Sequence, residues 1–204
     1  MKNLCVLLFL SPLLLSSQAK KASQLIEEGH KKYSLSSGQI EYKITGDAEG
    51  AEVMIFDHYG WRSMRKQTMI FELYEIKTIQ TLHEITDGDF VYRLNDGDST
   101  KISRKDYKWS QQAAYKEPKE VSEAILFSMG GTHVGDSLLL GKSCQVWLFD
   151  NKAIQELWTW NGLVLKRKIK LGEQIIYSTA ATIKLDVELD DVLFEIPDYL
   201  REKE

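Results

Sequence analysis

Residues Gln155–Leu171 read QELWTWNGLVLKRKIKL, two alternating runs of apolar and polar residues that meet at Asn161-Gly162. Asn-Gly is the dipeptide best suited to a two-residue type I′ turn, in which both positions need φ > 0. The stretch therefore predicts a β-hairpin. Because the turn brings its flanking residues face to face, it also predicts the register of the two strands.

In that register, one face of the hairpin carries two indoles, two leucines and an ion pair. The predicted pairs are Trp160/Leu163, Trp158/Leu165 and Glu156/Arg167, with Thr159/Val164, Leu157/Lys166 and Gln155/Lys168 on the other face. An apolar face of this size must be covered, either by the protein's own helices or by an apolar ligand. The candidate ligand-binding residues are therefore Trp158, Trp160, Leu163, Leu165, Glu156 and Arg167.

The first 19 residues have the pattern of a secretory signal peptide. Lys2 precedes a short apolar run, Leu4–Leu15, and Ser17-Gln18-Ala19 places small residues at the cleavage positions. The apolar run is too short for a membrane-spanning helix. We expect an exported, periplasmic protein whose single domain covers residues 20–204.

Composition excludes several classes of function. The formal net charge is −4 with the charges scattered, which favours neither a nucleic-acid interface nor any other strongly basic surface. Cys144 is the only cysteine after the signal peptide, so no intrachain disulfide is possible there. It lies in phase with Val146 and Leu148, which favours burial as a small apolar residue over a reactive thiol.

Two short helices are predicted among many strands. Ser23–Tyr33 has an apolar stripe with early acids and late lysines, with Ser23 as its cap, and Glu120–Met129 has a second stripe that ends at Gly130-Gly131. Two Asp-Gly pairs predict further hairpins. The first would pair Ile85/Phe90, His83/Tyr92 and Thr81/Leu94; the second would pair Tyr92/Lys101 and Val91/Ile102.

The remaining runs alternate as half-buried strands do. They lie at 40–44, 51–56, from 61, 76–85, 89–94, 99–103, 138–140, 143–149, 154–160, 163–171, 174–181 and 182–189. The fold class is mainly β (α+β). We expect a single open antiparallel half-barrel of about 9–11 strands, with the N-terminal helix and the short internal helix covering its concave face.

The order of motifs resembles the LolA/LolB superfamily of periplasmic lipoprotein carriers and their uncharacterised exported relatives. The resemblance is carried by KKYSLSSGQIEYKI, FDHYGW, ITDGDFVYRLND, GKSCQVW, WTWNGLVLKRK and the closing FEIPDYL. It spans nearly the whole chain after the signal peptide, and the hairpin is closer to that of the uncharacterised relatives. The resemblance implies an incomplete barrel lidded by helices, and in the carriers that cavity accepts acyl chains.

Catalytic and metal-binding patterns are weak. The four histidines, His30, His58, His83 and His133, stand at no ligand spacing, and no nucleophile elbow or phosphate-binding loop is present. The acids Asp186, Glu188, Asp190 and Asp191 favour a solvated strand face over a calcium site. We therefore predict no catalytic residue, no metal and no cofactor.

Two functions follow from this sequence. The first is a non-enzymatic carrier that binds an apolar ligand, namely a lipid, an acyl chain or a lipidated protein. The second is an interaction domain of the cell envelope with a permanently filled core and a protein partner. An unrecognised hydrolase ranks below both.

Overall fold

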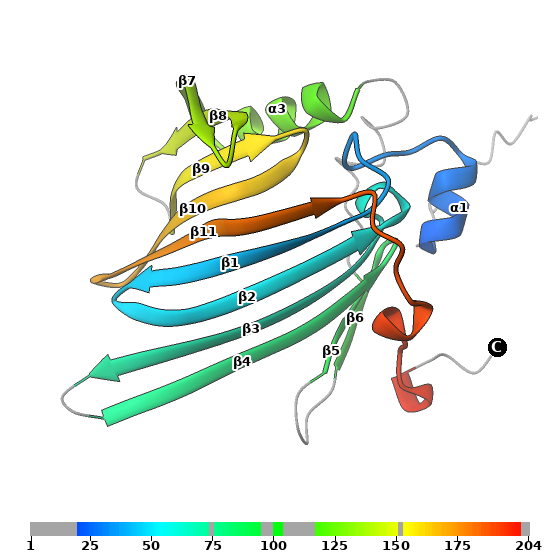
Figure 1. The fold of residues 1–204 in the computed structure, drawn as a ribbon, viewed down its shortest axis with the longest axis horizontal. Coiled ribbons are helices and arrows are strands. Elements are labelled where there is room, and N and C mark those ends of the chain that lie inside the picture. Colours follow the sequence, from blue (N-terminus) through cyan, green and yellow to red (C-terminus); the bar gives the residue numbers. More distant parts are fainter. Residues whose placement is uncertain (1–19, 74–75, 95–99, 104–116, 151–152, 201–204) are drawn as a thin grey trace, which may run out of the picture.

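A computed structural model of the chain describes residues 20–73, 76–94, 100–103, 117–150 and 153–200. The predicted signal peptide, the Asp96-Gly97 turn and most of the loop before Pro118 lie outside the described residues. The fold class predicted from the sequence is confirmed, because the described residues form an open antiparallel sheet with two short helices (Figure 1).

The sheet has eleven strands in the order β6-β5-β4-β3-β2-β1-β11-β10-β9-β8-β7. They are β1 (Gly38–Gly46), β2 (Ala48–Asp57), β3 (Arg62–Leu73), β4 (Ile76–Asp87), β5 (Phe90–Arg93), β6 (Thr100–Ser103), β7 (Gly131–Leu139), β8 (Lys142–Phe149), β9 (Ile154–Trp160), β10 (Leu163–Leu171) and β11 (Gln174–Leu185). Consecutive strands are antiparallel neighbours except β6 and β7, which lie at opposite edges, and β1 and β11 pair in the middle of the sheet. β6 and β7 form the two edges, so the sheet stays open.

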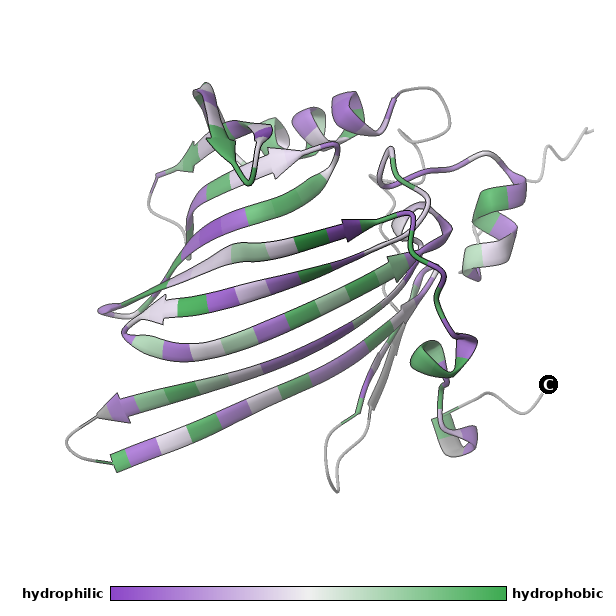
Figure 2. Cartoon of the chain, viewed as in Figure 1, coloured by the Kyte–Doolittle hydropathy of each residue, from purple (hydrophilic) through white to green (hydrophobic). Residues whose placement is uncertain are grey.

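Apolar and polar residues alternate along the strands (Figure 2), and the sheet carries a hydrophobic cluster on each face. On β1 and β2, Ile40, Tyr42 and Phe56 are buried in one cluster with Leu163 and Leu165. The next residues on the strands point to the opposite face, because side chains alternate. There Ile55, Met64, Ile85 and Tyr92 form a second cluster, covered by Phe194 and its neighbours in the C-terminal segment.

The N-terminal helix is shorter than predicted. α1 spans Ala22–Glu27 with Lys21 at its N-cap, where Ser23 was expected. It ends because Gly29 turns the chain with φ of 80°, and because the backbone N–H groups of Lys32 and Tyr33 donate to the Tyr59 carbonyl instead of continuing the helix. That carbonyl belongs to η1 (His58–Gly60), the turn between β2 and β3.

The internal helix α3 spans Pro118–Ser128 and so begins two residues before the predicted Glu120, with Pro118 in its first turn, where proline fits a helix. Gly130 follows its end, as the sequence indicates. Leu126 and Met129 pack with Trp147, Phe149 and Leu157 of β8 and β9. α3 therefore covers the β7–β9 end of the sheet (Figure 1). The sequence missed most of β7, which starts directly at Gly131.

The β4–β5 register predicted from Asp87-Gly88 is wrong, because the two-residue turn lies one residue later in the chain. Asp87 pairs with Phe90, and Ile85 pairs with Tyr92, so Gly88 and Asp89 form the turn. Contacts with the N-terminal segment hold it there, since Asp87 Oδ1 accepts from the Ala22 N–H at 2.9 Å and the Asp89 N–H donates to the carbonyl of residue 20 at 2.8 Å. The β5–β6 pairs Tyr92/Lys101 and Val91/Ile102 are confirmed.

β11 ends at Leu185, four residues before the predicted strand end. Asp186 adopts φ of 50°, and the chain then leaves the sheet to form η2 (Asp191–Phe194) and η3 (Asp198–Leu200). The alternating apolar residues of this segment serve to bury the face around Ile55, not to extend β11.

Candidate ligand-binding site

The hairpin at Asn161-Gly162 forms as predicted. Asn161 and Gly162 have φ of 50° and 84°, and Trp160 pairs with Leu163. The hairpin also has the bounds expected for its two strands, since β9 ends at Trp160 and β10 begins at Leu163.

Beyond the turn, the predicted pairs Trp158/Leu165 and Glu156/Arg167 are wrong. The register shifts between Val164 and Lys166, so Trp158 pairs with Lys166. This is a β-bulge, in which one strand contributes an extra residue. Leu157 then pairs with Arg167, and Glu156 pairs with Lys168. The predicted opposite-face pairs Leu157/Lys166 and Gln155/Lys168 shift with them.

The structure still gathers the two indoles and two leucines of the hairpin around one cluster. Leu163 and Leu165 are fully buried, whereas Trp158 and Trp160 pack against the same cluster and remain partly exposed. Tyr33 and Leu35, which follow α1 in the sequence, pack there too. The protein's own chain therefore covers much of this surface.

A close backbone approach holds that covering segment on the hairpin turn. The Ser34 N–H donates to the Asn161 carbonyl, and the Lys32 carbonyl lies so close to Gly162 that a side-chain Cβ there would stand 2.6 Å from its oxygen. The Tyr33 ring packs edge-on against Phe56, with ring centroids 5.0 Å apart, and burial raises the pKa of its hydroxyl to about 12. Glycine is thus required at position 162 for space as well as for its positive φ.

The polar atoms beside the indoles are paired locally. Glu156 accepts from Trp158 Nε1 at 2.6 Å and from Lys166 Nζ at 3.0 Å. The Lys166 ammonium lies 4.1 Å from the centre of the Trp158 ring, and Lys142 lies 4.6 Å from that of Trp160. These are cation–π contacts, so both exposed indole faces already carry a partner.

Arg167 pairs not with Glu156 but with Glu52 of β2. Glu52 is 3% exposed and also accepts from Arg65 Nε at 2.9 Å, from Arg65 Nη2 at 3.0 Å and from Gln67 Nε2 at 2.5 Å. The cluster of Glu52, Arg65, Gln67 and Arg167 is called the arginine cluster below. The pKa of Arg167 is lowered, chiefly because the side chain is buried, while the nearby Glu52 carboxylate acts to raise it.

The arginine cluster shows which face of the sheet is concave. β11 and β1 lie between Arg167 and Glu52, so the two positions are three strand spacings apart, roughly 14 Å in a flat sheet. Their side chains meet because the sheet curls toward this face. Tyr42 confirms the curvature, since its hydroxyl, on β1, donates to the Val164 carbonyl on β10 at 2.9 Å.

A second ion pair continues the row of charges. Glu84 of β4 stands beside Arg65 in register and accepts from Arg93 Nε at 3.1 Å. Arg93 is 40% exposed, so this pair lies at the solvated end of the row. Among the described residues, the row therefore holds three guanidiniums and two carboxylates.

A cavity of about 100 Å³ adjoins the arginine cluster. Apolar side chains supply most of its lining, and Arg65, Gln67, Arg167 and Ser178 supply the rest; the apolar ones are Ile44, Met69, Ile169, Leu171 and Ile176. Ile44 and Ile176 are buried, whereas Leu171 is 48% exposed. The lining thus runs from the core toward solvent at the end of β10.

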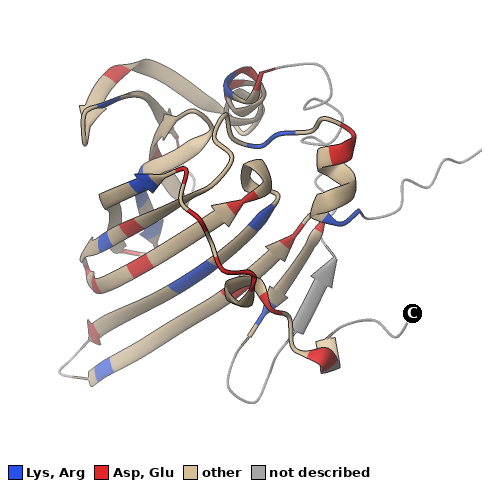
Figure 3. Cartoon of the chain, turned by 45° about the vertical axis from the view of Figure 1, so that its right-hand side comes forward, with Lys and Arg blue, Asp and Glu red and all other residues tan. Residues whose placement is uncertain are grey.

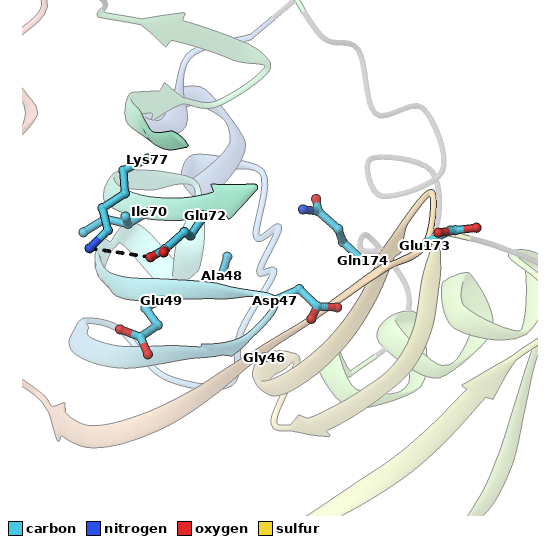
Figure 4. A pocket seen from close by; sticks show the side chains of 9 residues that line it. All are labelled: Gly46, Asp47, Ala48, Glu49, Ile70, Glu72, Lys77, Glu173 and Gln174. Carbon is cyan, nitrogen blue, oxygen red and sulfur yellow. Dashed lines mark ion pairs between the residues drawn. The ribbon is translucent and has the colours of Figure 1, made fainter. Parts of the chain in front are cut away.

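A larger cleft, about 580 Å³, lies at the strand ends near the β1–β2 turn (Figure 4). Asp47, Glu49, Glu72 and Glu173 contribute four acids to it, and Lys77 pairs with Glu72 at 3.5 Å. Neither hollow is lined by Trp158 or Trp160. Of the six candidate ligand-binding residues predicted from the hairpin, only Arg167 lines the cavity.

Acidic positions recur along the C-terminal segment after it leaves the sheet (Figure 3). Three of them have structural partners. Asp190 accepts from the Val192 N–H at the start of η2, and Asp191 pairs with Arg62 at 2.8 Å. Asp186 accepts from the Ser36 hydroxyl at 3.3 Å. Their side chains are exposed, as predicted, but they do not lie on a strand face, because β11 ends at Leu185. The Asp191–Arg62 pair fastens the C-terminal segment to β3.

Cys144 is completely buried and unpaired, as expected for a small apolar residue. Burial raises the pKa of its thiol. Of the residues that form the arginine cluster, sequence reasoning named only Arg167. One signal was available, because Glu52 stands in phase with Met54 and Phe56 and so had to face inward.

Among known proteins, those similar to this chain are solved structures. No family model and no curated protein sequence matches the chain. Solved structures similar to it include an uncharacterized conserved protein from Thermus thermophilus, with 9% identity, a TM-score of 0.49, and coverage of 88% of this chain and 96% of that one. LprF from Mycobacterium bovis has 10% identity and a TM-score of 0.37, with 83% and 95% covered.

A LolA superfamily protein from Nitrosomonas europaea is also among these structures. It has 11% identity and a TM-score of 0.28, with 89% of this chain and all of that chain covered. MucB has 10% identity and a TM-score of 0.40, with 87% and 63% covered. Within the described part of the chain, no helix is long and apolar enough to cross a membrane.

Proposed function

We propose that this protein is an exported, periplasmic, non-enzymatic carrier-like protein that binds an apolar ligand, namely a lipid, an acyl chain or a lipidated protein. The observation that carries the proposal is the cavity on the concave face, with five apolar lining residues that lead from buried Ile44 to exposed Leu171. Burial of apolar ligand surface there would supply ~25 cal/mol per Å². The resemblance to the lipoprotein carriers, read from the sequence, supports the same class of ligand.

The cavity is small for a whole acyl chain, because pockets for drug-sized ligands are typically ~300–1,000 Å³. Binding must therefore use more surface than the cavity alone. The tryptophan face of the hairpin would be that surface if the segment containing Tyr33 and Leu35 moved away as a lid. Trp158, Trp160, Leu163 and Leu165 would then contact the ligand.

A fluorescent fatty-acid analogue tests this proposal on the purified protein. We expect saturable binding that Leu171→Glu weakens, because its negative charge would stand at the mouth of the cavity and repel the carboxylate of the analogue. Leu138→Glu is the matched control, since Leu138 is 74% exposed on edge strand β7 and lines neither hollow. Saturable binding that both variants leave unchanged would place the ligand elsewhere.

Trp160→Ala tests the lid. Since Trp160 is partly exposed, the variant should stay folded by a cooperative melt, and it should bind the analogue more weakly if the hairpin face takes the ligand. If no apolar probe binds or shifts the melting temperature, the carrier proposal fails.

One observation favours the second candidate, an interaction domain with a filled core. Apolar side chains lie exposed on α3 and the neighbouring edge strand, with Phe127 75%, Val134 53% and Leu138 74% exposed. Exposed apolar patches beside an open sheet edge are typical of protein interfaces. An envelope protein partner would then bind at β7, and Leu138→Lys would weaken that complex.

A further inference from the structure

Two polar atoms at the cavity are buried without a hydrogen-bond partner among the described residues. They are Ser178 Oγ and Arg167 Nε. Ser178 is 3% exposed and pairs with Arg167 in the β10–β11 register, so the two side chains share one face and one hollow. A buried hydroxyl or guanidinium N–H without a partner is costly, so a site that keeps both is suited to an acceptor from outside the protein.

The charges at the same place favour an anion. Glu52 forms ion pairs with two guanidiniums, those of Arg65 and Arg167, and the adjacent Glu84 forms an ion pair with Arg93. An arginine stays ionised in proteins, so the arginine cluster carries one positive charge more than its carboxylate can neutralise. In a partly buried hollow that excess is screened less than at the surface and attracts a negative group.

We propose that this cavity is the head-group subsite of the carrier, where Arg167 Nε and Ser178 Oγ donate to the carboxylate or phosphate of an anionic amphipathic ligand. The inference rests on the proposed function, because the ligand's chain would run from this subsite along the concave face toward Leu165 and Leu163, on the tryptophan face of the hairpin. A volume of about 100 Å³ suits a head group and the first atoms of a chain, not a complete lipid. The ligand is therefore an anionic lipid or fatty acid, bound head first.

A matched pair of ligands tests the charge. Decanoate and decan-1-ol have the same chain and differ in the head, and their affinities can be measured by calorimetric titration at neutral pH. We expect decanoate to bind at least tenfold more tightly. Equal affinities would overturn the head-group subsite and leave the carrier function standing.

Two variants then assign the donors. Ser178→Ala should reduce the affinity for decanoate about tenfold without lowering the melting temperature, because the lost hydroxyl has no hydrogen-bond partner among the described residues. Ser143→Ala is the control at an exposed serine and should change neither quantity. Arg167→Gln should abolish the preference for decanoate over decanol. A preference that survives both Ser178→Ala and Arg167→Gln would overturn the assignment.

Short anions separate this proposal from the proposed function. If neither ten-carbon ligand binds, the carrier function fails, and butyrate and inorganic phosphate are tested alone by thermal shift. A rise in melting temperature that Ser178→Ala removes would support the subsite without a carrier role. If phosphate raises the melting temperature and butyrate does not, the natural ligand of the subsite is a free phosphate and not a lipid head group. No shift with either anion would overturn the subsite.

Discussion

Replacing Glu52 with Gln tests whether the buried carboxylate holds the curved sheet together. Glu52 accepts from Arg65, Gln67 and Arg167, and its side chain is 3% exposed. The amide keeps the size of the side chain but leaves two guanidiniums without a carboxylate between them. Breaking a buried ion pair in this way typically costs ~3–5 kcal/mol. Because Arg65 and Arg167 are 29% and 20% exposed, water solvates part of the charge, and we expect ~3 kcal/mol.

The measurement is equilibrium unfolding in urea, with thermal melts as a second readout. For a chain of this size ~3 kcal/mol corresponds to a fall in melting temperature of roughly 6–12 °C. Glu84→Gln is the control, since its partner Arg93 is 40% exposed, and it should cost less than ~1 kcal/mol. If Glu52→Gln costs no more than Glu84→Gln, the arginine cluster does not stabilise the concave face and the reasoning is refuted.

Three further predictions concern the turn, an acid and the thiol. Asn161→Pro should destabilise the protein by more than ~2 kcal/mol, because proline fixes φ near −65° where Asn161 has 50°; unchanged urea unfolding would contradict this. Burial acts to raise the pKa of Asp57, but hydrogen bonds from Arg62 and the His58 N–H hold it below the usual ~3.9. This contribution to stability is present above about pH 4 and lost as the pH falls through the depressed folded-state pKa, so Asp57→Asn should flatten the acid limb of a stability–pH curve. Cys144 should react with a thiol reagent only after unfolding, since it is fully buried; rapid labelling of the native protein would count against that burial.

Local turn chemistry explains what could be predicted of the fold. Asn161-Gly162 encodes a turn in two residues, and the bounds of β9 and β10 follow from it without any distant contact. The Asp87-Gly88 pair carries a similar signal, yet the turn moves by one residue. Its position depends on hydrogen bonds to the N-terminal segment, more than 60 residues away in the sequence, and no pattern within the hairpin contains that information.

The candidate site was predictable only in part, for a related reason. Alternation shows that Glu52 faces inward with Met54 and Phe56, which marks it as a buried charge in need of a partner. The partner, Arg167, lies 115 positions later, and its approach depends on the curvature of the whole sheet. Sequence periodicity gives the face of a strand but neither its bulges nor its curvature.

The bulge in β10 decides which charges meet. With strict pairing from the turn, Arg167 would oppose Glu156 and both charges would be neutralised within the hairpin. The extra residue between Val164 and Lys166 separates them, so that Glu156 binds Lys166 and Arg167 turns to Glu52. Glu52 already has Arg65 as a bidentate partner, and the second guanidinium therefore brings excess positive charge to the concave face. The irregularity that makes the predicted register wrong is thus the feature that supplies the cavity with a donor for an anionic ligand.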